Sequence, residues 1–284
     1  TSPDQQTTPA GTLDTKPDGD FYLVDDNFNG EAVQVRIARQ YYGRMVDIVA
    51  FEDAGLTQRT TVFEEFVVNP KSESGWPLPD FPLETNPVTG KPSLVIYRNF
   101  ADETPGGGRE EFLSLLSLAE SGVRPIADNG FVGAGTYSMV PRNAAIVVVF
   151  DDLVDPSTIN TQSVRLLVGE PTIIPFEARI FPDPNYGGLA EHDGQPGLEF
   201  YSTRLIVDPA VSEIESFNSD PTVAVNTIGF PASNEANLAN VELRFPTLEL
   251  PGQQQPLLQN PTAHPITSVS NGTFDFGSPG REVV

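Results

Sequence analysis

The chain has 284 residues, in which 16 Lys and Arg are outnumbered by 39 Asp and Glu, so the formal net charge is −23. A negative field of this size excludes nucleic acid as an expected partner, because it repels phosphate backbones, and it disfavours anionic membranes. The absence of cysteine excludes disulfides, thiolate catalysis and Cys-based zinc sites. The acidity attracts divalent cations such as calcium, although it also serves simply to keep an exposed protein soluble.

Proline and glycine are frequent, with 27 and 24 residues. Proline interrupts helices and interior sheet ladders, so this composition predicts short strands joined by turns and an all-β fold. No stretch approaches the roughly 18 apolar residues that a membrane-spanning helix needs, so we expect no membrane-spanning segment. A chain of this length is expected to hold two domains.

Residues 1–20 are polar and contain a single large aliphatic side chain, Leu13. Because such a segment buries too little apolar surface to offset its ordering entropy, we expect a flexible N-terminal arm or tether here. A β-rich domain with one helix is expected at 21–122. A second β domain is expected at 123–284, where the first residues are rich in turn formers.

The first expected domain contains strand patterns and one helical pattern. Period-two alternation and β-branched or aromatic runs predict strands at 33–37, 45–51, 60–68 and 93–97. Apolar residues then recur at helical spacing, which predicts a helix with one apolar face formed by Phe112, Leu115, Leu116 and Ala119. A glycine run, 106–108, precedes this helix, but no Lys-Ser/Thr pair follows it, which argues against a phosphate-binding loop.

The second expected domain begins with the most informative segment, 138–169. Residues 144–150 form a continuous apolar run of strand length, and 163–168 have the pattern of a second strand. Between them, Asp155 is a plausible N-cap and Pro156 suits the first position of a helical turn. We expect this turn to cross between two packed sheets, so that the second strand continues in the opposite sheet.

This segment resembles the Ig-like module of bacterial S-layer and other large surface proteins. The resemblance rests on Pro141, Asn143, Ile146 to Phe150, Asp151, Asp152, Val154, Asp155, Pro156, Ser157 and Thr158. It implies an Ig-like β-sandwich, an extracellular location and a scaffold role, and it names no catalytic residue. Further strand patterns at 222–230, 240–245 and 272–277 extend beyond the length of one such module, which indicates long insertions or a further β element.

Acidic loops are the candidate metal sites. Asp25, Asn27 and Asn29 follow the alternation of an EF-hand loop, and Gly30 comes next, which suggests a calcium site. Position twelve of such a loop is Arg36 in place of glutamate, so an Asx-rich hairpin turn is the alternative. Two further acidic groups lie at Asp151, Asp152 and Asp155 and at Asp183 with Asn185.

The sequence offers few candidates for catalysis. The chain has two histidines, His192 and His264, and no G-x-S-x-G elbow, so a Ser/His/Asp triad is not favoured. The run 191–194 could supply metal ligands, but a solvated turn explains it better. Glu64 and Glu65 would point to opposite faces of a strand, so they cannot act on one sugar bond. We therefore expect no enzymatic activity.

Aromatic residues in a proline-rich loop are the remaining candidates for binding. Trp76 lies in this loop with Phe81 nearby, and the pair would either stack on a sugar or pack at an interface. The leading expectation is an extracellular structural protein of a bacterial cell surface, such as an S-layer, filament or matrix subunit that associates with itself or with other surface proteins. The alternatives are an adhesin or carbohydrate-binding module that recognises glycans, and an accessory region of a larger secreted hydrolase.

Overall fold

The structure is a computed structural model, and it describes residues 13–24, 35–51, 54–55, 57–68, 83–85, 92–121, 124–125, 145–168, 174–175, 178–192, 194–209, 241–246, 256–265 and 273–275. These residues are mostly β-strand with one α-helix, as the composition predicts. The expected strand at 222–230 lies outside the described residues. Among the residues described, no helix is long and apolar enough to cross a bilayer.

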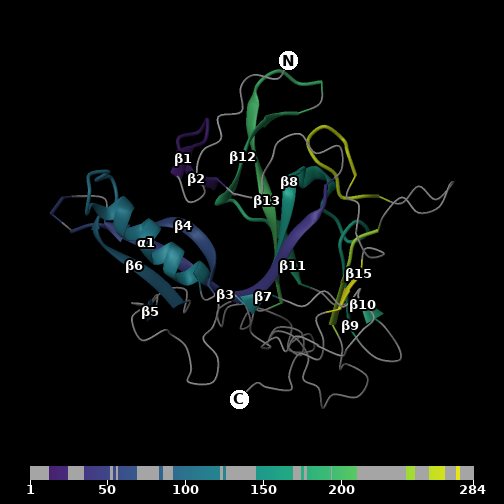
Figure 1. Cartoon of the computed structure of the whole chain (residues 1–284), viewed down its shortest axis with the longest axis horizontal. Helices are drawn as coiled ribbons and strands as arrows, with labels where there is room; N and C mark the ends of the chain where they lie inside the picture. The colour runs from purple at the N-terminus through teal and green to yellow at the C-terminus, as the bar shows by residue number, and fades with distance from the viewer. Residues whose placement is uncertain are drawn as a thin grey trace, which may run out of the picture.

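Eleven strands form one large mixed sheet, whose main path runs in the order β1-β2-β12-β13-β8-β3-β6-β5 (Figure 1). Three more strands pair beside this path: β11 with β13, and β4 and β7 with β3. Two pairs, β2 with β12 and β3 with β6, are parallel, and the others are antiparallel. The strands of this sheet are β1 (Leu13–Thr15), β2 (Phe21–Val24), β3 (Ile37–Phe51), β4 (Arg59–Val68), β5 (Leu83–Thr85), β6 (Pro92–Asn99), β7 (Arg124–Pro125), β8 (Ala145–Val154), β11 (Arg179–Pro182), β12 (Tyr186–Glu191) and β13 (Leu198–Asp208).

The central strand β8 is buried on both faces. Ile146, Val148 and Phe150 belong to one core cluster, whereas Ala145, Val147 and Val149 belong to another. Because successive strand residues point to opposite faces, a strand that is covered on both sides needs an unbroken apolar run. The continuous pattern at 144–150 therefore reflects the position of β8 in the middle of the molecule.

The long strand β3 pairs with four other strands, β4, β6, β7 and β8. Its first part, from Ile37 to Gly43, pairs with β8, and its second part, from Arg44 onward, pairs with β4, while Asp47 to Phe51 also pair with β6. The hydrogen-bonded sheet is thus continuous between strands of the predicted domains 21–122 and 123–284. The division into these two domains stays a prediction.

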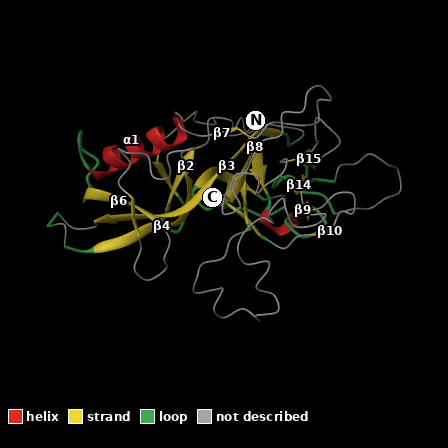
Figure 2. Ribbon diagram, turned by 90° about the horizontal axis from the view of Figure 1, so that it is seen from below, coloured by secondary structure: helices red, strands yellow, loops and turns green. Residues whose placement is uncertain are grey.

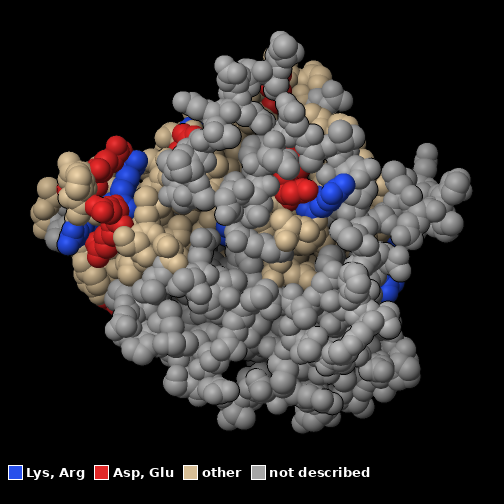
Figure 3. Space-filling model, in the orientation of Figure 1, with Lys and Arg blue, Asp and Glu red and all other residues tan. Residues whose placement is uncertain are grey.

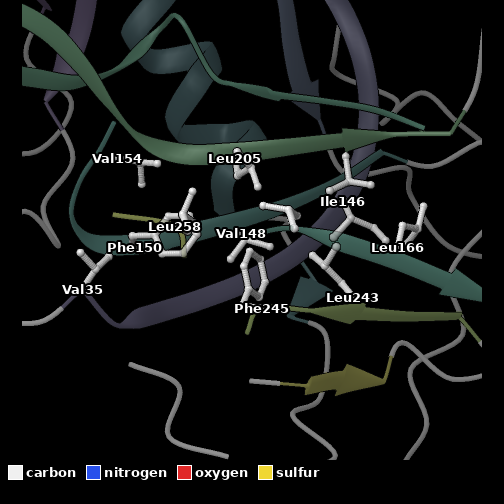
Figure 4. Close-up of a cluster of buried hydrophobic side chains, with 12 residues drawn as sticks. Val35, Ile146, Val148, Phe150, Val154, Leu166, Leu205, Leu243, Phe245 and Leu258 are labelled. Carbon is white, nitrogen blue, oxygen red and sulfur yellow. The ribbon is translucent and has the colours of Figure 1, made fainter. Parts of the chain in front are cut away.

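A smaller sheet of four strands packs against the large one. Its order is β10-β9-β14-β15, with bounds Ile174–Pro175, Arg165–Val168, Val241–Arg244 and Thr273–Asp275. A shared core lies between the two sheets, where Phe150 of β8 meets Phe245 edge to face, with ring centroids 6.0 Å apart (Figure 4). The chain passes from β8 in one sheet to β9 in the other through a 3₁₀ turn, η1 (Pro156–Thr158), so the predicted crossing is confirmed.

The helix α1 (Gly108–Ser121) covers the part of the sheet that contains β6 (Figure 2). Three residues of the predicted apolar face lie toward the core: Phe112 and Leu116 are buried, and Leu115 packs beside them, while the side chain of Ala119 lies outside the described part. Gly108 permits this close packing, because a Cβ there would lie 2.2 Å from the backbone oxygen of Asn99. Figure 3 shows acidic and basic side chains gathered over α1 and the preceding loop, where Arg109 Nη1 contacts Glu103 Oε1 at 2.6 Å.

Candidate functional site

Two regions of the described structure tie together segments that are distant in the sequence. The first, here called the β8 junction, lies where β8 ends and consists of Asp151, Asp152, Asp155, His192, Asn260 and His264. The second, here called the hairpin site, is where β1 and β2 contact Phe100, Arg109, Pro184, Asn185, Tyr186 and Phe200.

Asp155 is the N-cap of η1. Its Oδ1 accepts a hydrogen bond of 2.9 Å from Ser157 N, and Pro156 occupies the first position of the turn, as predicted. The backbone N–H of Asp155 donates to Gln259 O at 2.8 Å, while Gln259 N donates to Thr158 Oγ1 at 3.1 Å. A single short turn therefore fixes the crossing between the sheets and a loop about one hundred residues later in the chain.

Asp152 holds the same distant loop through its side chain. Its Oδ2 accepts a 2.9 Å hydrogen bond from Asn260 Nδ2, and its Oδ1 accepts one of 2.7 Å from Leu153 N. Burial raises the pKa of the Asp152 carboxyl, because the charged form is desolvated, and these hydrogen bonds oppose that shift. The carboxylate is thus engaged with amide donors that hold it in place.

Asn260 shapes the loop that Asp152 holds. Its Oδ1 accepts hydrogen bonds from Thr262 N at 3.1 Å and from His264 N at 2.8 Å. Ala263 takes a positive φ of 62°, a conformation that L residues with a side chain rarely adopt. Because that conformation costs free energy, the hydrogen bonds of Asn260 are needed to hold the turn closed.

Asp151 completes the row of three aspartates. Its Oδ1 accepts a 2.7 Å hydrogen bond from Arg36 N, and its own N–H donates to Arg36 O at 3.0 Å. The carboxylates of Asp151 and Asp152 therefore bind distant parts of the chain, the residue before β3 and the loop around Asn260, while that of Asp155 caps the turn that follows it. Within the described ranges, no three or more His, Asp and Glu side chains are grouped so as to hold a metal ion.

The two histidines lie at this junction, in structural contacts. His192 Nε2 is 3.4 Å from Asp155 Oδ2, and its ring lies beside Tyr201, with ring centroids 6.4 Å apart. Burial raises the pKa of Tyr201 to about 12, with help from the hydrogen bond that its hydroxyl donates to Glu199. His264 Nδ1 pairs with Thr262 Oγ1 at 2.8 Å. Within the run 191–194, His192 is thus partly buried against the junction, whereas Glu191 and Gly194 are exposed and Asp193 lies outside the described residues.

The hairpin site receives β1 and β2, which form a short hairpin of their own. Its turn is closed by hydrogen bonds from Lys16 N to Asp20 O at 2.7 Å and from Gly19 N to Lys16 O at 3.0 Å. Gly19 has a φ of 94°, which glycine adopts without strain. Residues 13–20 of the predicted arm 1–20 therefore form β1 and a turn, and residues 1–12 lie outside the described part.

The hairpin joins the large sheet because β2 pairs with β12. The pairing is parallel and short, with Leu23 opposite Tyr186 and Val24 opposite Gly187, and Leu23 N donates to Asn185 O at 2.6 Å. The Leu23 side chain is 1% exposed and belongs to the core cluster beneath α1. Full burial of a leucine contributes roughly 1.5–3 kcal/mol, so Leu23 is the apolar anchor of the hairpin.

Lys16 anchors the turn end of the hairpin. Its Nζ donates to Pro184 O at 2.6 Å and lies 4.2 Å from the centroid of the Phe200 ring. Burial lowers the pKa of this ammonium, and nearby Asp20, Asp18 and Asp183 oppose the shift. Asp183 and Asn185, one of the acidic groups seen in the sequence, form the turn between β11 and β12, where Asp183 Oδ1 accepts from Asn185 N.

A stack of aromatic rings connects the hairpin to α1. Phe21 meets Phe100 edge to face at 6.0 Å, and the guanidinium of Arg109 lies 4.4 Å from the centroid of the Phe21 ring. On the other side of the hairpin, the ring of Tyr22 lies 5.1 Å from that of Phe200. The hairpin therefore bridges the helix-covered part of the sheet and the β12–β13 pair.

Sequence reasoning found one of these regions and missed the other. The aspartates of the β8 junction follow a strongly apolar strand. The hairpin site was missed because residues 1–20 contain a single large aliphatic residue, Leu13. The Pro-Asp-Gly turn signal at 17–19, followed by the apolar run 21–24, could have revealed it. The predicted calcium residues Asp25, Asn27 and Asn29 and the predicted interface residues Trp76 and Phe81 lie outside the described residues.

In the part of the chain that the structure describes, fold and sites together define a β-rich protein with two packed sheets and one covering helix, in which the β8 junction and the hairpin site join distant segments. No protein family, curated protein or solved structure matches this chain.

Proposed function

We propose that the chain is an extracellular structural protein of a bacterial cell surface, built around an Ig-like β-sandwich and acting in assembly. One observation carries the proposal: the carboxylate of each aspartate at the end of β8 is engaged in hydrogen bonds that hold the fold together. Asp151 binds Arg36, Asp152 binds Asn260 and Asp155 caps η1. Carboxylates used in this way serve rigidity, which a surface lattice or filament requires.

The crossing from β8 to β9 supports the Ig-like part of the proposal. In the resembling surface modules, an apolar strand ends in acidic residues and a short Asp-Pro-Ser-Thr turn leads into the other sheet. Here the apolar strand is β8, the turn is capped by Asp155, and β9 resumes in the four-stranded sheet. Greek-key sandwiches use such crossings to close a core between two sheets.

Electron microscopy of the purified chain tests the assembly role. We expect ordered polymers or sheets to form as the protein concentration rises, and we expect no turnover in a broad screen of hydrolase substrates. A protein that stays monodisperse at every concentration, with and without millimolar calcium, would contradict the proposal.

Calcium binding by Asp25, Asn27 and Asn29 is a separate part of the proposal and has its own test. Thermal unfolding is measured at increasing calcium concentration, with magnesium as the matched control. We expect a calcium-specific rise in the melting temperature that is lost in Asp25→Asn, because a ligand that binds only the folded state stabilises it. An unchanged melting temperature at millimolar calcium removes this site.

A further inference from the structure

We propose that the β1–β2 hairpin of one copy of this chain occupies the hairpin site of a second copy, joining neighbours by strand addition at β12. The inference rests on the proposed assembly function and names its partner and its surface. The structure shows how a hairpin fits this site, because the chain's own β1–β2 hairpin occupies it.

The hairpin is a separable unit. It closes on itself through three register pairs between β1 and β2 and through the hydrogen bond from Tyr22 Oη to Asp14 Oδ2 at 3.1 Å. The docking contacts described above link it to residues far along the chain, such as Phe100, Pro184 and Phe200. A neighbouring copy presents the same groups, so docking on it would form the same contacts.

The connection to the rest of the chain has the length that such an exchange requires. Ten residues, 25–34, separate Val24 from Val35, which is buried in the core between the sheets. An extended chain of ten residues spans up to about 35 Å, comparable with the diameter of a small domain. The hairpin can therefore reach a neighbour while Val35 stays in its own core.

Undocking the hairpin costs free energy, because it exposes apolar surface on both the hairpin and its site. Undocking exposes Leu23 and Tyr22 on the hairpin and Tyr186 on the site, all of which are at most 4% exposed in the structure. A copy whose hairpin has undocked therefore binds a hairpin at this site again, either its own or that of a neighbouring copy. Since the contacts are the same, the outcome depends on the neighbour's concentration relative to the effective concentration of the tethered hairpin, about millimolar for a short linker.

Charge sets the conditions under which exchange occurs. Two copies that each carry −23 repel one another, and this repulsion is screened over about 8 Å at physiological ionic strength. The contacts at the site itself are an apolar anchor, a backbone ladder and the cation–π contact of Lys16, which salt weakens little. Exchange is thus expected to increase with salt as well as with protein concentration.

The absence of cysteine permits a direct test by thiol cross-linking. Pro17→Cys places a thiol on the exposed turn of the hairpin, and Pro184→Cys places one on the exposed turn beneath it. The two single variants are mixed in denaturant, refolded together at increasing concentration, and treated with a flexible bis-maleimide. The double variant reports the contact within one chain, and Pro17→Cys mixed with Ser114→Cys, on the exposed side of α1, is the matched control.

We expect a cross-linked mixed dimer whose ratio to monomer rises about tenfold for a tenfold rise in protein concentration, as mass action requires. The Ser114→Cys control should give no such species. The inference is overturned if the mixed pair gives no more dimer than this control at any concentration or salt, while the double variant cross-links within one chain.

Microscopy of the unmodified chain separates this inference from the proposed function. Ordered polymers without cross-linking between the mixed copies would overturn hairpin exchange and leave the assembly function standing. A cross-linked mixed dimer without any polymer would support exchange and contradict the assembly function.

Discussion

At the scale of single residues, Asp155 combines a helix cap with a contact to His192. Its Oδ1 accepts from Ser157 N at 2.9 Å, and its Oδ2 lies 3.4 Å from His192 Nε2. Replacing an N-cap aspartate by alanine costs about 0.5–2 kcal/mol, whereas asparagine caps equally well. We therefore expect Asp155→Ala to lower the free energy of unfolding by about 1 kcal/mol and Asp155→Asn to retain most of it, measured by urea unfolding.

Ser157 supplies the control for the Asp155 variants. It is exposed, and Asp155 accepts a hydrogen bond from its backbone N–H and not from its hydroxyl. Ser157→Ala should leave the urea midpoint within experimental error of the parent. Equal midpoints for Asp155→Ala and the parent would mean that water replaces the cap and that the junction does not depend on it.

The pKa values of Tyr22 and Tyr201 depend on how deeply their hydroxyl groups are buried. Desolvation raises the pKa of Tyr22 and of Tyr201 to about 12, from an ordinary value of 10.0. Because the pKa is higher in the folded state, each phenol contributes stability that is complete below pH 10 and is lost as the pH rises toward 12. We expect Tyr22 and Tyr201 to ionise late in an absorbance titration at alkaline pH, and Tyr22→Phe and Tyr201→Phe each to remove one late ionisation.

The double variant is the decisive sample in that titration. If Tyr22→Phe combined with Tyr201→Phe shows as many late ionisations as the parent chain, neither tyrosine is a late group, and the packing of Tyr22 on Phe200 does not raise its pKa.

At the scale of elements, α1 depends on one aromatic side chain. Phe112 is fully buried and meets Phe100 edge to face, with ring centroids 5.6 Å apart. Truncating a buried phenylalanine to alanine costs about 3–5 kcal/mol through lost burial and the cavity left behind. We expect Phe112→Ala to lower the free energy of unfolding by that amount and Ser114→Ala, on the exposed side of the helix, to change it by less than about 0.5 kcal/mol.

The packing of strand β12 against β13 depends on a glycine, Gly187. A Cβ at Gly187 would lie 2.0 Å from the backbone oxygen of Tyr201, so any side chain there forces β12 away from β13. We expect Gly187→Ala to lower the melting temperature by several degrees, roughly 2–4 °C for each kcal/mol lost, and to weaken hairpin docking because β2 pairs with β12. Ala190→Ser, at a partly exposed position of the same strand, should have little effect, and equal melting temperatures for the two variants would refute this account.

The sequence predicts those features of the fold that depend on neighbouring residues, but not the pairing of distant segments. Signals carried by neighbouring residues were sufficient for α1, for β8 and for the turn at Asp155 and Pro156, because capping and periodicity are local properties. The pairing of Asp152 with Asn260 joins residues 108 apart, and no local pattern specifies it. The parallel addition of β2 to β12 was missed for the same reason, since neither strand indicates its partner.

At the scale of the whole molecule, charge is the dominant property. With 39 acidic and 16 basic residues, the folded chain repels itself, and unfolding relieves part of that repulsion by separating the charges. We expect the melting temperature to rise between about 0.01 and 0.5 M sodium chloride, where the screening length falls from roughly 30 Å to a few ångströms. A sucrose series at matched osmolality is the control for general solvent effects.

A melting temperature that falls with salt would contradict this expectation. It would mean that ion pairs such as Arg179–Asp208, at 2.6 Å, contribute more to the folded state than the net repulsion removes. Such pairs at partly exposed positions contribute at most about 1 kcal/mol each, so we expect repulsion to prevail.

The parallel pair of β2 with β12 has a consequence for the order in which the chain acquires its structure. Leu23 meets Tyr186, so the hairpin is synthesised long before the strand that receives it, and β12 itself needs β13 beside it. Contacts between segments so distant in sequence form slowly, because closing a long loop costs entropy before any pairing compensates it. A newly made chain therefore presents an undocked hairpin until nearly the whole sheet exists, and copies maturing side by side meet during that interval.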